Sequence, residues 1–276
     1  MRNLTQVTQQ HYRSDGLLER ILAGLRAAGK NPEAPTVEDL APADEFHSLG
    51  RAATRELAEL AQIAPGTRLL DVGSGLGGPA RYLASACGCD VTGIDLTPEF
   101  CEVANELSRR TGLAGRSRFR QADALALPFA EGEFDAVWTF QTQMNIADKR
   151  RFYAEIRRVL RPGGRLMFQD ILEGNGRALE FPVPWASEAD CSHLIKPNAL
   201  RDLLRELGLI EVLWRDATAA IVEWQARNIP PKNSPLPPLG MHLVLGPLHA
   251  EKRANANRAL RDGRFVYIQG VFEKTR

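Results

Sequence analysis

Closely spaced glycines and a neighbouring carboxylate are the residues of this sequence whose types and spacing most directly suggest chemistry. The apolar run 69–70 is followed by Asp71, and then by Gly73, Ser74 and Gly75 ahead of a helical pattern. This order predicts a strand, a tight turn and the start of a helix. Glycines let backbone N–H groups approach a ligand closely, and a helix N-terminus favours an anionic group. The sequence therefore predicts a site for a nucleotide-like ligand.

Two further carboxylates follow the next two predicted strands. Asp95 lies 22 residues after Gly73, where a carboxylate can accept hydrogen bonds from ribose hydroxyls. Asp123 can accept a hydrogen bond from an adenine amino group. The glycine spacing alone fits both a dinucleotide and an adenosyl cofactor. Asp71 favours an adenosyl cofactor. A dinucleotide-binding turn usually has an apolar residue at this position, and a carboxylate suits a ligand with positive charge.

The elements that must position these residues alternate along most of the chain. Two helices are predicted first, at 5–29 and 43–63. The predicted strands are 67–72, 90–95, 117–121, 134–140, 164–172, 209–214 and 264–272, and the later helices are 78–86, 98–112, 148–160, 198–207, 216–228 and 247–261. Alternation of this kind predicts an α/β fold with a doubly wound, parallel sheet. We expect residues 1–64 to form a helical lid and 65–276 the cofactor-binding core, with an insertion near 173–197 at the acceptor site.

Composition narrows the classes of partner. The 276 residues carry 35 basic and 34 acidic side chains, so the net charge is +1 and nothing favours a nucleic acid or an anionic membrane surface. No run approaches the ~18 apolar residues of a membrane helix, and the first residues lack an apolar signal core. We expect a cytoplasmic protein without a membrane partner. The four cysteines follow no zinc or disulfide spacing, and no metal site is predicted.

Taken together, the ordered motifs resemble the class I S-adenosylmethionine-dependent methyltransferases. They are the glycine-rich turn, Asp95, Asp123 and the Pro-Gly-Gly turn at 162–164. Segments 45–47, 92–97 and 124–129 look like the branch that holds ubiquinone/menaquinone, tocopherol and sarcosine/dimethylglycine methyltransferases. The resemblance implies a Rossmann-like methyltransferase fold, a mostly parallel sheet of seven strands whose last strand is antiparallel. It also implies S-adenosyl-L-methionine as cofactor.

The resemblance also implies individual roles for the site residues. Gly73, Ser74 and Gly75 would lie against the methionine moiety, and Asp95 would bind the ribose hydroxyls. The residues expected around adenine are Leu96, Asp123, Ala124 and Leu125. Asp71 and Gln141 complete the expected cofactor site, and Arg51 could pair with the methionine carboxylate, although a solvated side chain is the simpler expectation there.

Residues near the acceptor are harder to assign from sequence. The strand 134–140 leads into the polar segment 141–145, which we expect to floor the reaction site. Gln143 and His47 are the candidate catalytic residues, His47 because imidazole titrates near neutral pH. Other candidates for the acceptor pocket are Gln169, Asp170, Phe181, Pro182, Trp185 and His193.

These observations predict an S-adenosylmethionine-dependent methyltransferase that acts on a small molecule by in-line transfer to a nitrogen, carbon or oxygen atom. Such transfer needs alignment and desolvation but no covalent nucleophile. Two alternatives stay open, a nicotinamide-dependent oxidoreductase and a non-catalytic S-adenosylmethionine-binding protein. A homodimer is also an open alternative.

Overall fold

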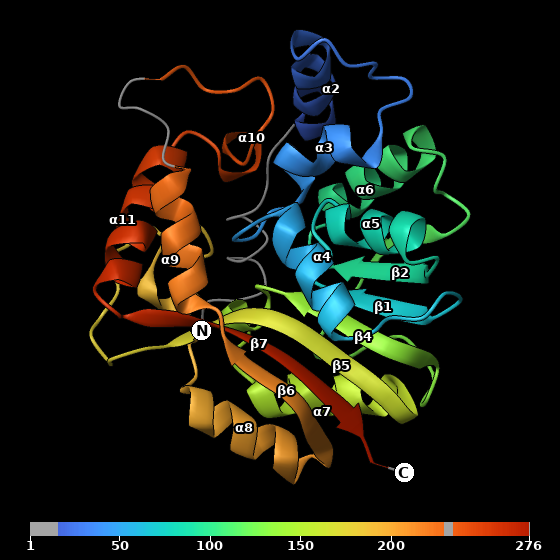
Figure 1. The fold of residues 1–276 in the computed structure, drawn as a ribbon, viewed down its shortest axis with the longest axis vertical. Coiled ribbons are helices and arrows are strands. Elements are labelled where there is room, and N and C mark those ends of the chain that lie inside the picture. Colours follow the sequence, from blue (N-terminus) through green and yellow to red (C-terminus); the bar gives the residue numbers. More distant parts are fainter. Residues whose placement is uncertain (1–15, 229–233, 276) are drawn as a thin grey trace.

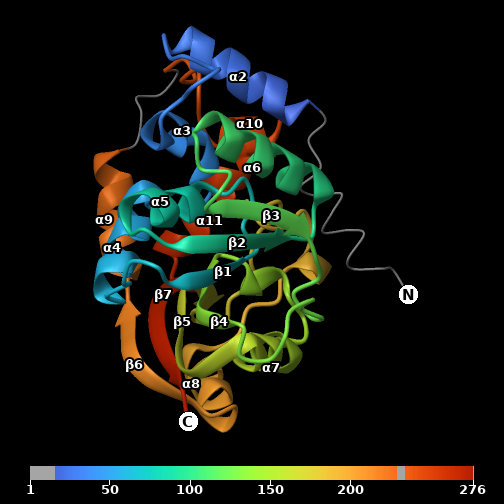
Figure 2. The ribbon, with the colours of Figure 1, turned by 90° about the vertical axis from the view of Figure 1, so that its right-hand side faces the viewer.

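A single seven-stranded sheet organises the protein. The computed structural model describes residues 16–228 and 234–275. The strand order is β3-β2-β1-β4-β5-β7-β6 (Figures 1 and 2). The strands are β1 (Arg68–Val72), β2 (Asp90–Asp95), β3 (Ser117–Gln121), β4 (Phe134–Phe140), β5 (Leu160–Glu173), β6 (Leu209–Asp216) and β7 (Phe265–Lys274). Strands β1 to β5 pair in parallel, whereas β7 lies antiparallel between β5 and β6. The predicted α/β fold is confirmed, including its antiparallel last strand.

Helices cover both faces of this sheet. One face carries α4 (Arg51–Leu60), α5 (Gly78–Ala86) and α6 (Pro98–Arg110), and the other carries α7 (Lys149–Val159) and α8 (Pro197–Glu206). Successive side chains of β1 point to opposite faces of the sheet. Leu70 packs toward α7 and α8, whereas Leu69 packs toward α4 and α5. On α7, Phe152, Ile156 and Val159 recur at helical spacing and are fully buried. Burial of such a side chain contributes about 1.5–3 kcal/mol.

The N-terminal helices differ from the prediction. Helix α2 (Leu17–Ala27) confirms the second half of the helix predicted at 5–29, whose residues before 16 lie outside the described residues. The predicted helix over 43–63 is wrong as one element, because α3 (Val37–Asp44) ends before α4 begins. Leu49 and Gly50, between them, have φ values of 69° and 50°. A right-handed helix cannot continue through this left-handed conformation, so the chain turns.

The later part of the chain folds back over the carboxyl ends of the parallel strands (Figure 1). Helices α9 (Thr218–Arg227) and α11 (His249–Arg261) confirm two predicted helices and pack with the insertion against β7. A short helix that was not predicted, α10 (His242–Leu245), lies beside α2. Its Val244 is buried in one cluster with Leu17 of α2 and Leu40 of α3. Part of the proline-rich crossover before α10, at 229–233, lies outside the described residues.

The described helices include none with the length and apolar character of a membrane span. Two groups of segments lie over the carboxyl ends of the strands. One group is α2, α3 and α10, and the other is the 3-10 turn η1 (Gln143–Asn145) after β4 together with the insertion and its 3-10 turn η2 (Ala189–Cys191). The pocket described next lies between them.

Candidate functional site

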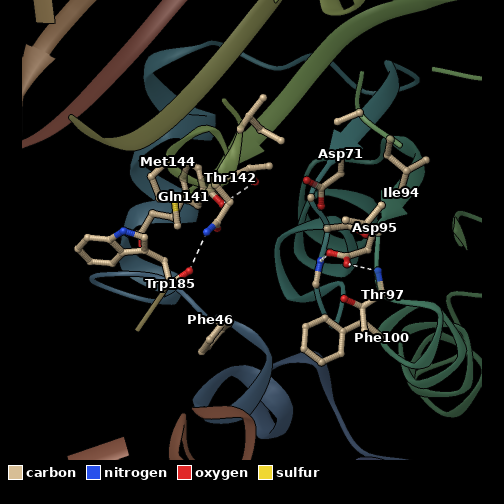
Figure 3. Close-up of a pocket in the computed structure, with 18 of the residues that line it drawn as sticks. Phe46, Asp71, Ile94, Asp95, Thr97, Phe100, Gln141, Thr142, Met144 and Trp185 are labelled. Atoms are coloured by element: carbon tan, nitrogen blue, oxygen red, sulfur yellow. Dashed lines mark hydrogen bonds between the residues drawn. The ribbon is translucent and has the colours of Figure 1, made fainter. Parts of the chain in front are cut away.

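A pocket lies at the carboxyl ends of β1, β2 and β4, where a doubly wound sheet usually binds its ligand. Figure 3 shows two facing walls, with Asp71, Asp95 and Phe100 on one side and Met144 and Trp185 on the other. Ten residues predicted to bind the cofactor line this pocket: Asp71, Gly73, Ser74, Gly75, Asp95, Leu96, Asp123, Ala124, Leu125 and Gln141. The fold thus brings together residues that are spread over about 70 positions of sequence.

The glycine turn is shaped by close packing. Gly73 has a φ of 76°, and its N–H and that of Ser74 both donate to the Ile94 carbonyl at 2.9 Å. A Cβ atom at Gly73 would lie 2.2 Å from Thr142 Oγ1. Glycine is therefore required twice at this position, by its backbone angle and by the approach of the segment that follows β4.

Asp95 holds the turn to the neighbouring strand. Its Oδ2 accepts a hydrogen bond from the Gly75 N–H and its Oδ1 accepts one from the Thr97 N–H, each at 2.9 Å. Burial raises the pKa of Asp95, and these two hydrogen bonds oppose the rise. The Thr97 hydroxyl and the Leu96 N–H also bond to this carboxylate, so hydroxyl groups of a ligand would share its oxygens with these protein donors.

Asp71 is a buried carboxyl group whose Oδ2 has no hydrogen-bond partner among the described residues. Burial raises its pKa to about 8, and the nearby charges of Asp95 and Glu45 add to the rise. A cationic group of a ligand would relieve this unfavourable charge. The buried polar atoms Ser74 Oγ and Gln141 Nε2 also have no hydrogen-bond partner among the described residues. These unpaired groups fit a ligand that combines a positive charge with hydrogen-bonding groups.

His47 lines the pocket but is already paired. Its Nε2 lies 2.7 Å from Glu45 Oε2, its Nδ1 lies 3.3 Å from the Ser48 carbonyl, and its ring contacts Phe140 edge-on. Glu45 is buried and also accepts hydrogen bonds from Thr54 and Arg51. Burial raises the pKa of Glu45, but its bonds to His47, Arg51 and Thr54 outweigh burial and lower it. His47 is thus held by a partner that the sequence did not reveal.

Gln143 and Arg51, two of the predicted site residues, lie outside the pocket lining. Gln143 is fully buried and its Nε2 donates to the Ile171 carbonyl at 2.8 Å, so the prediction that it acts at the reacting atoms is not supported by its position. Arg51 pairs with Glu45 and Glu38 and lies over the Tyr82 ring instead of reaching the pocket. Both side chains are held by partners within the protein.

The insertion contributes only part of the acceptor residues predicted from sequence. Trp185 and His193 line the pocket. Gln169 and Asp170 are fully buried beneath it, and Phe181 and Pro182 lie outside its lining. Trp185 also packs on Phe265 in the core, so it anchors the insertion as well as facing the cavity.

Sequence reasoning missed several lining residues. Phe46, Phe100, Ile146 and Met241 add apolar surface, and Asp44 adds a buried carboxyl group. The Oδ2 atom of Asp44 accepts a hydrogen bond from Arg81, which also donates to the Leu76 carbonyl of the glycine loop. The segment at Asp44 thereby docks on the cofactor loop through a buried ion pair. Nothing in the local sequence indicates this contact between residues 37 positions apart.

Comparisons with known proteins agree with this geometry. Residues 70–168 match the family model described as a methyltransferase domain. A methyltransferase from Streptomyces halstedii is 37% identical over 141 residues, covering 51% of this chain and 49% of that protein. The chloroplastic tocopherol O-methyltransferase of Arabidopsis thaliana is 34% identical over 155 residues, covering 49% of this chain and 44% of that protein. The chain thus spans about half the length of these curated relatives.

A solved structure shares the fold over the whole chain. The geranyl diphosphate C-methyltransferase of Streptomyces coelicolor A3(2) has a TM-score of 0.70 at 18% identity and covers 100% of this chain and 99% of its own. At this identity the likeness concerns the fold alone. The matched segment runs from β1 to β5 and includes the glycine turn, Asp95 and Asp123. Residues 70–168 therefore match a methyltransferase domain, the class of domain that the sequence motifs resemble, and the seven-stranded fold around them is shared with the solved methyltransferase structure.

Proposed function

We propose that this protein is an S-adenosyl-L-methionine-dependent methyltransferase that acts on a small molecule. The observation that carries the proposal is the unpaired, buried carboxyl group of Asp71 in a pocket that also holds the glycine turn, Asp95 and Asp123. S-adenosylmethionine carries a positive charge, two ribose hydroxyls and an adenine amino group. The pocket offers the Asp71 carboxyl group to balance the charge, and Asp95 and Asp123 as hydrogen-bond acceptors for the hydroxyls and the amino group. The nicotinamide alternative gains no support from the relatives.

In this assignment, Gly73, Ser74 and Gly75 hold the methionine end and Asp95 holds the ribose. Asp123 holds the adenine amino group, with Leu96 and Leu125 on the ring faces. The cofactor supplies a methyl group on a sulfonium, which is already activated for displacement. The protein has to exclude water and align the acceptor with that methyl group. The second wall of the pocket, with Met144 and Trp185, is the place for the acceptor (Figure 3).

The charges of the lining favour an acceptor without a phosphate or carboxylate. Among the described lining residues there is no lysine or arginine. The ionisable side chains that line the pocket are Asp44, Asp71, Asp95, Asp123, Asp148, His47 and His193. The described lining offers a phosphorylated acceptor no lysine or arginine to offset its charge, so we infer a neutral or cationic molecule. A nucleic acid is disfavoured on the same ground. The cytoplasmic location, the lid at 1–64 and a homodimer stay predictions.

Calorimetric titration tests the cofactor. We expect micromolar binding of S-adenosylmethionine and S-adenosylhomocysteine and no binding of NAD. Binding of NAD alone would contradict the proposal. If the adenosyl ligands bind but no acceptor of any class is methylated, the protein is a cofactor-binding protein without turnover, which was the second alternative.

A further inference from the structure

His193 is a pocket residue whose main chain is fixed while its imidazole is not. Its N–H donates to the Met144 carbonyl at 2.7 Å, and its carbonyl accepts a hydrogen bond from Lys149 Nζ at 2.6 Å. The partly buried imidazole lines the cavity and makes no hydrogen bond within the described residues. It is therefore anchored in position with both ring nitrogens available to a ligand.

Lys149 is a buried cation that ties the insertion to the turn after β4. Its ammonium group donates to three backbone carbonyls, those of Gln143, Ile146 and His193. A protonated lysine has three N–H donors, so the group is satisfied only in its charged form. Burial lowers the pKa of Lys149 to about 8, against the effect of the Asp170 carboxylate. Lys149 is thus a clamp that works when protonated.

Asp170 holds the other end of the same turn. Its Oδ2 accepts hydrogen bonds from the N–H groups of Thr142 at 3.2 Å and Gln143 at 3.1 Å. Burial raises the pKa of Asp170 to about 6, opposed by these backbone bonds and by Lys149. Near neutral pH the turn therefore has an anion at its N–H end and a cation at its carbonyl end. Met144 lies in this turn, and its carbonyl accepts the hydrogen bond from the His193 N–H.

The surroundings of His193 keep its ring neutral. Burial and the positive charge of Lys149 lower the pKa of His193, and Asp190 acts in the opposite direction. A histidine below its ordinary pKa of about 6.5 is mostly neutral at pH 7 and can accept a proton. His47 differs, because both of its ring nitrogens already have partners in the protein.

We propose that His193 is the general base of the reaction and that the acceptor is an uncharged, largely apolar molecule with a hydroxyl group. This inference rests on the proposed function. A ring nitrogen of His193 takes the hydroxyl proton and becomes imidazolium, and the oxygen lone pair forms the new C–O bond. The C–S bond breaks, its electron pair stays on sulfur, and the imidazolium returns the proton to solvent. Lys149 is a positioning residue, since it acts only through His193 and the turn.

The remaining lining supports this acceptor. Met144, Ile146, Trp185 and Met241 offer apolar and aromatic surface. A neutral amine already has a lone pair for attack and would not need a base, whereas a hydroxyl gains from one. The neutral imidazole thus favours an oxygen acceptor over a nitrogen acceptor.

Three probes of one shape test the acceptor class: 2-naphthol, 2-naphthylamine and 2-naphthyl phosphate, each with S-adenosylmethionine. We expect methylation of 2-naphthol and little or none of the other two. The variant His193→Asn should lower kcat for 2-naphthol about 100-fold or more, as expected for loss of a general base. Its affinity for S-adenosylhomocysteine should stay within about twofold of the parent protein. His249→Asn, on α11 outside the pocket, is the matched histidine control and should leave kcat unchanged.

The clamp is tested by pH and by spectroscopy. In the parent protein kcat/KM should rise with pH to a plateau, as His193 becomes neutral, and fall above about pH 8 as Lys149 loses its proton. Lys149→Gln removes the charge that lowers the pKa of His193, so NMR of ¹³C-labelled histidine should show a higher pKa for that ring. The acidic limb of kcat/KM should move with it. Lys149→Arg keeps the charge and should keep the ring pKa near that of the parent.

Each remaining outcome decides the question. If S-adenosylhomocysteine fails to bind the parent protein, the proposed function itself fails. Suppose that S-adenosylhomocysteine does bind. The assignment of His193 as base is then overturned if His193→Asn keeps the rate with 2-naphthol. The hydroxyl acceptor is overturned if 2-naphthylamine is methylated or if none of the three probes is. An unchanged ring pKa in Lys149→Gln would remove Lys149 from the proposal.

Discussion

Glu45 Oε2 and His47 Nε2 lie 2.7 Å apart, and both side chains are buried where α3 ends and the chain turns toward α4. Arg51 and Thr54 of α4 donate to the same carboxylate. The Glu45 carboxylate thus connects the segment between α3 and α4 to α4 itself. This arrangement explains why His47 faces the pocket without being available as a base. It lies at the break that Leu49 and Gly50 make in the predicted helix over 43–63.

We expect Glu45→Gln to lower the free energy of unfolding by about 2–3 kcal/mol, because it leaves the buried His47 and the partly buried Arg51 without their full charge partner. The pKa of Glu45 is lowered in the folded protein, so its contribution is present above its ordinary pKa and is lost as pH falls through the folded value. The difference between parent and variant should therefore shrink in acid. Urea unfolding at several pH values measures it.

Glu38→Gln is the matched control. Glu38 pairs with the same Arg51, but its side chain is 69% exposed. An exposed ion pair contributes about 0–1 kcal/mol, so this variant should stay within about 0.5 kcal/mol of the parent. Equal losses in the two variants would mean that the buried carboxylate has no special part in holding the turn.

The second prediction concerns ligand affinity at Asp95. Asp95→Ala should weaken S-adenosylhomocysteine binding by about 1.5–3 kcal/mol, or about 10- to 150-fold in Kd, through loss of charge-assisted hydrogen bonds. Isothermal titration calorimetry measures the change. Asp90→Ala, at the exposed start of the same strand, should bind the ligand as the parent does. An unchanged Kd in a folded Asp95→Ala variant would refute the ribose assignment.

Much of the fold could be predicted because its signals are local. The glycine turn, Asp95 and Asp123 each lie at the end of a predicted strand or just after it, so topology brings them together once the strands pair in order. The direction of Gln143 could not be predicted, since it depends on a hydrogen bond to Ile171, 28 positions away. The clamp at Lys149 likewise needs the insertion to return to it, 44 positions later. Lys149 is the first residue of the amphipathic helix α7, and nothing in the sequence around it indicates that its ammonium group binds backbone carbonyls.

A third prediction uses the pKa of Asp71. Its folded pKa of about 8 lies above the ordinary value, so the folded protein binds more protons than the unfolded chain between about pH 4 and pH 8. The stability of the ligand-free protein should fall as pH rises through this range. Asp71→Asn removes this slope and should unfold at higher denaturant concentration than the parent at pH 8. Guanidinium midpoints for both proteins at pH 5 and pH 8 measure the effect.

The same variant should bind S-adenosylmethionine more weakly, because the carboxylate that would face a cation is gone. A variant that gains stability at pH 8 while losing affinity fits a site whose charge is unfavourable until the ligand arrives. If the stability of parent and variant shows the same pH dependence, Asp71 is ionised in both states and the inferred unfavourable charge is wrong.

The last prediction separates two demands on glycine. Gly73 and Gly112 have nearly the same left-handed φ, 76° and 73°, but a Cβ at Gly73 would meet Thr142 at 2.2 Å whereas nothing lies within 4 Å of one at Gly112. Gly112→Ala should therefore cost only backbone strain, about 1 kcal/mol. Gly73→Ala should cost at least about 2 kcal/mol more, because the segment after β4 has to move, and should abolish S-adenosylhomocysteine binding. Thermal unfolding and calorimetry of the two variants make the comparison, and equal losses would show that backbone angle alone requires glycine in the cofactor turn.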